Sequence, residues 1–196
     1  TDGLVDFYLP GYVKTGLTAT LRKVGKSIKA KFTDVNDQVV PLHMQVRPEV
    51  IEALGKLASG GSSMESRANA ARAVGVLRGR AAVPHLLEAI RSKNTQVIYE
   101  SLIALQKIQE PSAAKDIAFL LRDLDDRVQV AALETTGLLG NKDALPQLYD
   151  ALKNARNARV RRAALTAIAM LPDESSRPHY NQYINQKDEL TRAAAA

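Results

Sequence analysis

The amino-acid sequence repeats itself with a period of about 31 residues, and this period limits the fold more than any other feature. The segment 127–146, RVQVAALETTGLLGNKDALP, predicts a helix, a Gly-Asn turn and the start of a second helix. Equivalent positions recur at steps of 31, 31 and 32 residues, as in the series Arg67, Ile98, Gln129 and Arg161. A period of this length with two helices per unit predicts an α-solenoid, in which stacked units supply the core that one unit cannot form alone.

The predicted array spans residues 48–196 and is all-α. Its first helices are expected at Ser66–Leu77, Val97–Ile108, Val128–Leu139 and Val160–Leu171. The second helices are expected to start near Pro84, Ser112, Pro146 and Pro178. Pro48 begins a further helix with an apolar stripe, and Arg192 continues the series in a truncated fifth unit. The sequence thus predicts about four and a half stacked helical hairpins.

Small and capping residues recur at fixed places in the units. Alanine pairs on the first helices are expected to let neighbouring helices approach closely: Ala70-Ala71, Ala131-Ala132 and Ala163-Ala164. Gly75 and Gly137 match each other, near the expected helix ends. Asp and Asn in the turns are expected to cap the following helices. We interpret the acidic cluster of Asp123, Asp125 and Asp126 in this way, rather than as a cation or acid/base site.

The composition excludes several classes of site and of protein. The chain has no cysteine, which excludes disulfides, thiolate catalysis and cysteine-bound zinc. It has no run of 18 apolar residues that would predict a membrane span. It opens without Met and closes on Leu190–Ala196, which resembles the start of a helix, so we expect a fragment of a longer protein. The compartment stays unassigned, with the cytoplasm slightly favoured; a signal or anchor in a missing N-terminal segment would change this assignment.

Residues 1–47 are interpreted as a basic, irregular N-terminal extension. Its positive charges, the candidate contacts for an anionic surface, are Lys14, Arg22, Lys23, Lys26, Lys29 and Lys31. Apolar residues at helical spacing predict a helix within Val13–Lys31, and alternation from Ser27 to Val46 predicts a hairpin after it. The favoured role is a cap over the open end of the solenoid. The alternatives are contact with an anionic membrane surface and contact with a partner.

The repeats resemble a known family, the short bacterial HEAT-like repeats of the PBS-lyase type. The residues that carry the resemblance are 127–133 (RVQVAAL), 158–165 (ARVRRAAL) and 144–148 (ALPQL). The resemblance covers residues 48–196 and implies a right-handed superhelix with a binding surface. It leaves the ligand open, because such repeats occur in scaffolds, phycobilin lyases, DNA glycosylases and an iron-dependent hydroxylase.

Two arginine clusters are the candidate binding surface, made of Arg156, Arg159, Arg161, Arg162, Arg78 and Arg80. Units in register place such groups along one ridge, which suits phosphate or an acidic peptide. The favoured interpretation is that these arginines pair with Asp or Glu of neighbouring units, as Arg67 and Arg72 in the second cluster also would. The repeat region carries 20 basic and 17 acidic residues with few aromatics, which argues against nucleic-acid binding.

The remaining candidates give no catalytic or metal site. The histidines His43, His85 and His179 lack the His-Glu pairs of the iron hydroxylases, so we predict no metal and no cofactor. Four tyrosines at helical spacing are expected in the core or at its rim rather than in a ligand cradle: Tyr99, Tyr149, Tyr180 and Tyr183.

The sequence therefore predicts a protein that is not an enzyme: a scaffold or adaptor that binds an unidentified protein along the concave face of the solenoid. One alternative is a lyase-like enzyme accessory that acts on a partner protein. The other is a binder of nucleic acid or of an anionic membrane through the basic extension.

Overall fold

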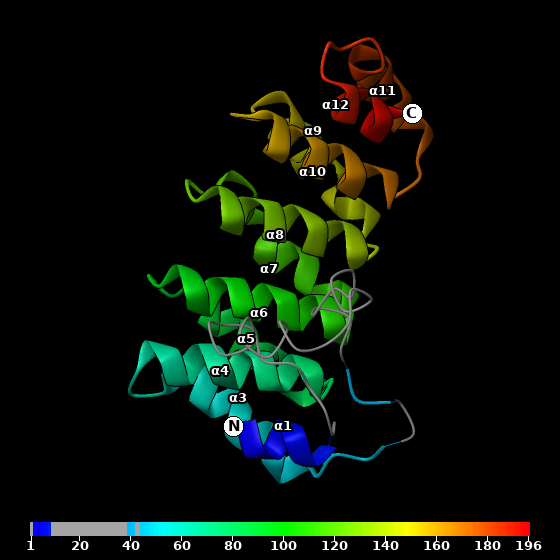
Figure 1. Cartoon of the computed structure of the whole chain (residues 1–196). Coiled ribbons are helices and arrows are strands. Elements are labelled where there is room, and N and C mark those ends of the chain that lie inside the picture. Colours follow the sequence, from blue (N-terminus) through cyan, green and yellow to red (C-terminus); the bar gives the residue numbers. More distant parts are fainter. Residues whose placement is uncertain (1, 9–38, 42–43) are drawn as a thin grey trace, which may run out of the picture.

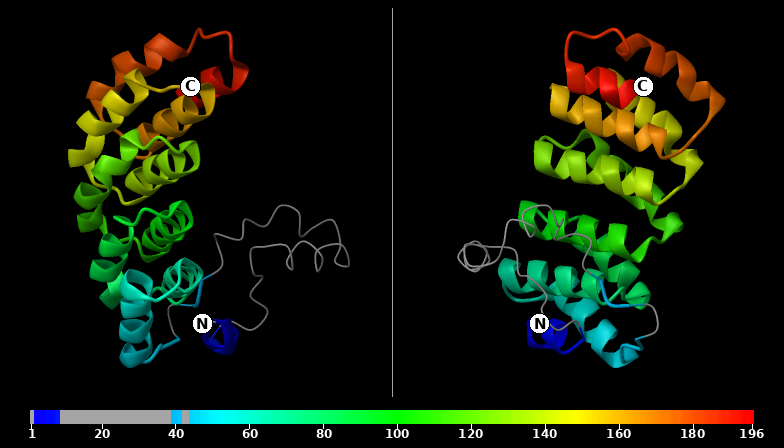
Figure 2. Two further views of the ribbon diagram at one scale, coloured as in Figure 1. Left: turned by 90° about the vertical axis from the view of Figure 1, so that its left-hand side faces the viewer. Right: turned by 45° about the vertical axis from the view of Figure 1, so that its right-hand side comes forward.

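The structure, a computed structural model, describes residues 2–8, 39–41 and 44–196, and within these ranges it is an α-solenoid without strands. Helices of two layers stack along one axis, and the array bows so that one layer lines its concave side (Figures 1 and 2). The prediction of an all-α array of stacked helical hairpins is confirmed.

The concave layer consists of five helices that lie side by side in chain order. They are α4 (Met64–Val76), α6 (Thr95–Ile108), α8 (Asp126–Leu138), α10 (Ala158–Ala169) and the shorter α12 (Glu189–Ala195). The first four begin two residues before the predicted starts, because a side-chain cap precedes each one. Asn94, for example, accepts hydrogen bonds from the amides of Gln96 and Val97, at 3.0 and 3.1 Å.

After its first helix, the convex layer is made of shorter and less regular helices. It contains α3 (Pro48–Gly60), α5 (Val83–Ala89), α7 (Ala114–Ile117), α9 (Leu145–Lys153) and α11 (Arg177–Tyr183). Short 3₁₀ turns precede the last four at Arg80–Ala82, Pro111–Ala113, Lys142–Ala144 and Glu174–Ser176. A further 3₁₀ helix at Ala118–Arg122 extends α7. Proline lies in the first turn of α3, α5, α9 and α11, where its missing N–H is harmless.

The hairpins begin with the helix that the sequence analysis placed second. Each convex helix packs mainly on the concave helix that follows it, so the pairs are α3–α4, α5–α6, α7–α8, α9–α10 and α11–α12. The predicted division into units was therefore shifted by half a unit, and the described residues form five pairs rather than four and a half. A sequence period determines the length of the unit, whereas only the packing of the helices shows where each unit starts.

The core follows the contact lines between these helices. Its fully buried large side chains come from both layers, for instance Leu86 and Leu148 on the convex side and Leu102, Leu133 and Leu165 on the concave side. Burying one such leucine stabilises the fold by about 2–3 kcal/mol. The repeat positions thus supply one continuous core that runs through the array.

Small residues bring the concave helices unusually close together. A Cβ atom on Gly75 of α4 would lie 2.7 Å from the Cα of Ala104 in α6, and one on Gly137 of α8 would lie 2.8 Å from the Cα of Ala167 in α10. The expectation that these glycines lie near helix ends is confirmed, because each is the last residue but one of its helix. Their absent side chains also permit backbone contact with the next unit.

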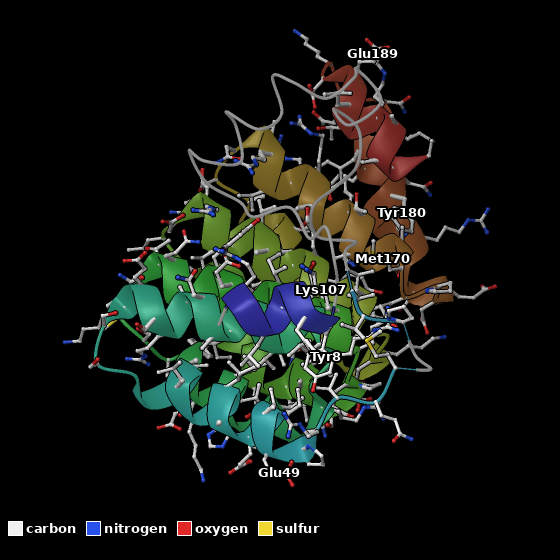
Figure 3. The ribbon with its side chains drawn as sticks, turned by 60° about the horizontal axis from the view of Figure 1, so that its bottom comes forward. Tyr8, Glu49, Lys107, Met170, Tyr180 and Glu189 are labelled. Atoms are coloured by element: carbon white, nitrogen blue, oxygen red, sulfur yellow. The ribbon has the colours of Figure 1, made fainter. Side chains whose placement is uncertain are left out.

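Part of the N-terminal extension packs against the first pair. The first helix, α1 (Asp2–Tyr8), lies on the concave side of the array beside α4, and its Val5 and Tyr8 are buried (Figures 2 and 3). The sequence analysis expected irregular structure there. Spacing of three residues between Val5 and Tyr8 is helical, but the run is too short to show a period.

The predicted hairpin is wrong in the part that the structure describes. Residues 39–41 and 44–46 form no strand; Val40 is buried, and its amide donates to the carbonyl of Val76 at the end of α4, at 2.8 Å. The predicted helix within Val13–Lys31 and the first half of the hairpin lie outside the described residues.

The glycine contacts predict a specific sensitivity of the packing. Replacing Gly75 by Ala should lower the free energy of unfolding by about 1–3 kcal/mol, because the new methyl group meets backbone that cannot move aside. The matched control is Gly60→Ala at the end of α3, where no atom lies within 4 Å of the new Cβ; it should be neutral or slightly stabilising. Urea denaturation followed by circular dichroism measures both. Equal stability of the two variants would contradict the packing argument.

Candidate functional site

The candidate site is the concave surface of α8 and α10, where equivalent positions expose side chains of the same kind. Arg127 and Arg159 match across the two helices, as do Glu134 and Thr166, and Leu138 and Met170. Positions seven and eleven residues apart lie on one face of a helix, so each set of three shares a face. Because α8 and α10 lie side by side along the axis of the array (Figure 2), these matched pairs form rows that cross from one helix to the other.

The basic row consists of Arg127 and Arg159, and Arg162 lies one turn further along α10. The guanidinium carbon of Arg127 lies 3.9 Å from the centroid of the Tyr99 ring, and its Nη1 donates to the Gln96 side chain at 3.1 Å. Arg159 is exposed, and Arg162 lies 3.2 Å from the Asp188 carboxylate. Arg127 is held by a ring and a neutral amide, so its positive charge is available to a ligand.

The apolar row consists of Leu138 and Met170, which are 42% and 41% exposed. The equivalent positions on α4 and α6 are Val76 and Lys107, which are 0% and 8% exposed. The concave surface therefore differs along its length: it presents apolar side chains to solvent over α8 and α10 but not over α4 and α6. Arg127, Leu138 and Met170 were not predicted as site residues. The sequence did carry a signal for the two rows, because Arg127 and Arg159 are 32 residues apart, as are Leu138 and Met170.

The arginines that the sequence analysis selected do not gather into one site. Arg156 is a structural residue: its guanidinium donates to the carbonyls of Asp123 and Leu124 and to the side chains of Asp126 and Gln129, at 2.7–3.0 Å. It thereby joins the α9–α10 pair to the pair before it. The buried Gln129 in turn donates to the carbonyl of Leu121, at 2.7 Å.

The other selected arginines also contact a neighbouring unit. Arg161 stacks on Tyr183 of α11, with 6.0 Å from its guanidinium carbon to the ring centroid. Arg78 donates to the carbonyl of Lys107, at 3.3 Å, and Arg80 lies 3.7 Å from the carboxylate of Glu110. Only Arg159 and Arg162 of the predicted set thus face the concave surface. The six Lys and Arg residues of the extension lie outside the described residues.

The second predicted arginine cluster contains a largely buried ion pair. Arg72 of α4 donates to both oxygens of Glu100 in α6, at 3.1 and 2.8 Å, and the Glu100 side chain is 7% exposed. Arg67 donates to the carbonyl of Ala58. The pair of Arg72 and Glu100 agrees with the favoured interpretation, in which repeat arginines pair with Asp or Glu of neighbouring units, whereas Arg67 binds a backbone carbonyl instead.

The histidines, tyrosines and acidic turn residues are structural where they are described. His179 stacks on Tyr149 with 4.0 Å between ring centroids, and Tyr149 bonds to Ser175 and Ser176. Burial, with a smaller contribution from the nearby Tyr149, raises the pKa of Tyr180. Asp125 accepts bonds from the amides of Arg127 and Val128 and so caps α8, as predicted. His43 lies outside the described residues.

His85 makes two longer contacts on the convex side. Its Nδ1 lies 3.4 Å from the Ser59 hydroxyl and its Nε2 lies 3.8 Å from the Glu52 carboxylate. Glu52 also pairs with Lys56 at 3.2 Å, and this contact is the main cause of its lowered pKa. Both distances are longer than the hydrogen bond that activates a serine nucleophile.

Among the described residues, no group of three or more His, Asp or Glu side chains is placed to hold a metal ion. No described helix has the length and apolar character needed to cross a membrane. The cavities are shallow; one of about 500 Å³ lies beside α3 and α1 and is lined by Leu4, Val50, Ala53, Leu54, Leu57, Arg47 and Glu49.

Comparisons with known proteins support the repeat architecture. A family model described as HEAT repeats matches residues 117–196, and one described as PBS lyase HEAT-like repeat matches residues 66–92. No curated protein matches the sequence.

Two solved structures have a similar fold. A chain in the complex of CpcE and CpcF of phycocyanin lyase from Nostoc sp. PCC7120 is 20% identical, with a TM-score of 0.57, and the match covers 100% of this chain and 74% of that one. An engineered protein is 19% identical with a TM-score of 0.54, and the match covers 74% of this chain and 76% of its own. Identities this low establish the shared fold only.

The geometry predicts opposite roles for two neighbouring arginines. Arg156→Ala should lower the free energy of unfolding by about 1–3 kcal/mol, because it leaves two carbonyls and two side chains without their donor. Arg159→Ala should change it by less than about 0.5 kcal/mol, because the side chain is exposed. Urea denaturation of the two variants measures the difference. A larger effect at Arg159 than at Arg156 would contradict the assignment.

The cap of α12 predicts a dependence on pH. Hydrogen bonds from Thr191, with a smaller contribution from Arg162, lower the pKa of Asp188 below its ordinary value of 3.8. A lowered folded-state pKa stabilises the fold above pH 3.8, and this contribution is lost as the pH falls through the folded-state value. Asp188→Asn should therefore weaken the docking of α12 at neutral pH and remove this part of the acid sensitivity. Hydrogen exchange of the α12 amides at pH 7 and pH 3 provides the measurement; identical exchange in variant and parent would refute the cap's role.

Proposed function

Since the chain is a HEAT-like repeat protein with an uneven concave surface, we propose that it is a non-catalytic scaffold that binds a protein partner over α8 and α10. The observation that carries the proposal is the exposed apolar row of Leu138 and Met170 beside the basic row. Exposed apolar side chains next to arginine are typical of protein interfaces, where methionine and arginine are enriched.

The rest of the array supports this role by holding the surface rigid. Close helix contacts at Gly137 fix α8 against α10, and the Arg156 network fixes the turns beside them. A preorganised surface loses little conformational freedom when a partner binds, which favours affinity. Of the six arginines predicted as a binding surface, the proposed site keeps Arg159 and Arg162, and it adds Arg127.

A second candidate function is an accessory role in a lyase reaction on a partner protein. It is favoured by the match of residues 66–92 to the PBS lyase HEAT-like repeat and by the shared fold with the phycocyanin lyase subunits. The two functions differ in a direct readout. A lyase-like accessory should change the visible absorbance of an added linear tetrapyrrole on mixing, whereas a scaffold without a chromophore site should leave it unchanged.

The proposed function predicts which surface retains a partner. We expect the double variant Leu138→Ser/Met170→Ser to retain a specific partner from lysate of the source cell at least fivefold less than the parent chain, because both apolar contacts are lost. The matched control is Phe119→Ser on the convex side, which removes a side chain that is 50% exposed and should retain the same protein fully. Affinity purification with quantitative mass spectrometry measures retention. Equal retention by the double variant and its parent would eliminate the concave surface as the binding site.

A further inference from the structure

We propose that the concave surface of α8 and α10 receives an amphipathic helix with an acidic face, which lies along the axis of the array between the basic row and the apolar row. This inference rests on the proposed function and names the chemistry of the partner segment. It is carried by the positions of the two rows, by the side chains between them and by the charge of the arginines.

The spacing of the rows fits one helix. Arg127 and Leu138 are eleven residues apart on α8, which places their Cα atoms about 16 Å apart along the helix axis at a rise of about 1.5 Å per residue. A helix with its side chains is about 10–12 Å wide, so it fits between the rows and reaches both with its opposite flanks. Adjacent concave helices are about 8–10 Å apart, which is close to two turns of a bound helix. The partner should therefore present matching residues about seven positions apart.

Between the rows the side chains of α8 and α10 are of mixed size. Val130 and Ala131 of α8 are 8% and 2% exposed, and Ala163 of α10 is 8% exposed. Glu134 is exposed there, and Arg162 of α10 lies at the position that matches Val130. A partner helix can therefore pack on the small side chains of α8 and α10, and it meets Glu134 and Arg162 beside them.

The charges select an acidic face for the flank that meets the basic row. Among the described residues, neither Arg127 nor Arg159 pairs with a carboxylate, whereas Arg162 is partly neutralised by Asp188. Arg127 is fixed by its stack on Tyr99, so its free N–H groups meet a carboxylate at little entropic cost. Glu134 lies between the rows and already has an interaction of its own within the protein, so the acidic flank of the partner is assigned to the arginines.

The apolar row determines the other flank. Leu138 and Met170 bury apolar surface only against an apolar partner, and each methylene group removed from water contributes about 0.8 kcal/mol. Methionine adapts its shape to a partner's side chains because it is unbranched and flexible. An acidic helix without an apolar face would leave this row exposed, so both faces are needed.

The test uses three fluorescein-labelled 18-residue helical peptides. The acidic peptide carries Glu on one face and Leu on the other, both repeated at seven-residue spacing; the basic peptide has Lys in place of Glu; the polar peptide has Ser in place of Leu. Fluorescence anisotropy at 50 and 300 mM NaCl measures binding to the whole chain. We expect the acidic peptide to bind at least tenfold more tightly than the other two, with weaker binding at the higher salt because screening reduces the charge attraction.

Variants of the protein locate the contacts. Arg127→Ala/Arg159→Ala and Leu138→Ser/Met170→Ser should each weaken binding of the acidic peptide about tenfold, which corresponds to about 1.4 kcal/mol. Arg122→Ala is the matched control: its side chain is exposed and pairs with Asp150 of α9, away from the concave surface, and the variant should bind as the parent does. Circular dichroism confirms the fold of each variant. Because the arginines are exposed, their double variant keeps the test decisive even where the apolar variant unfolds.

Several outcomes would overturn the inference. They are equal affinity for the acidic and basic peptides, no binding of the acidic peptide up to millimolar concentration, or no effect of the arginine substitutions. Tighter binding of a 20-base-pair DNA duplex than of the acidic peptide, lost in the same arginine variant, would assign the basic row to nucleic acid instead. A cellular partner that needs Leu138 and Met170, together with failure of the peptide test, would leave the proposed function standing and remove only the acidic helix.

Discussion

Close contact between consecutive concave helices is the constraint on which this structure depends. Gly75 packs on Ala104 and Gly137 on Ala167 at distances that leave no room for a Cβ atom. Each concave helix therefore has its neighbour's backbone as part of its own environment. Stability of such an array is a sum over units and their interfaces, so these contacts govern both folding and the shape of the surface.

Polar side chains also join each of several units to the next one. The pair of Arg72 and Glu100, the network of Arg156, and the bond from Gln106 to Thr135 at 2.9 Å each join one unit to the next. Buried members of these contacts are satisfied: among the described residues that are not exposed, no buried side-chain nitrogen or oxygen lacks a partner. Polar contacts between units fix the register of neighbours that an apolar core alone would leave less defined.

The concave surface changes character along the array, and this change separates the proposed binding region from the rest. Over α4 and α6 the positions that match Leu138 and Met170 are buried, and α1 packs on that side against α4. Over α8 and α10 these positions are open and carry leucine and methionine. Equal repeats thus provide unequal surfaces, because solvent-facing positions contribute little to the core and are free to vary.

The sequence by itself determined the period, the all-α class, the capping residues and the approximate helix ranges, because local propensity and apolar spacing act within a single unit. It also favoured the pairing of repeat arginines with Asp or Glu of neighbouring units, as Arg72, Arg80 and Arg156 show. Only the tertiary structure decided which helix opens each hairpin, that α1 is helical, and that Arg127, Arg159, Leu138 and Met170 share one surface. Those properties depend on which faces of distant segments pack together. The spacing of apolar residues within one unit does not record how that unit packs on the others.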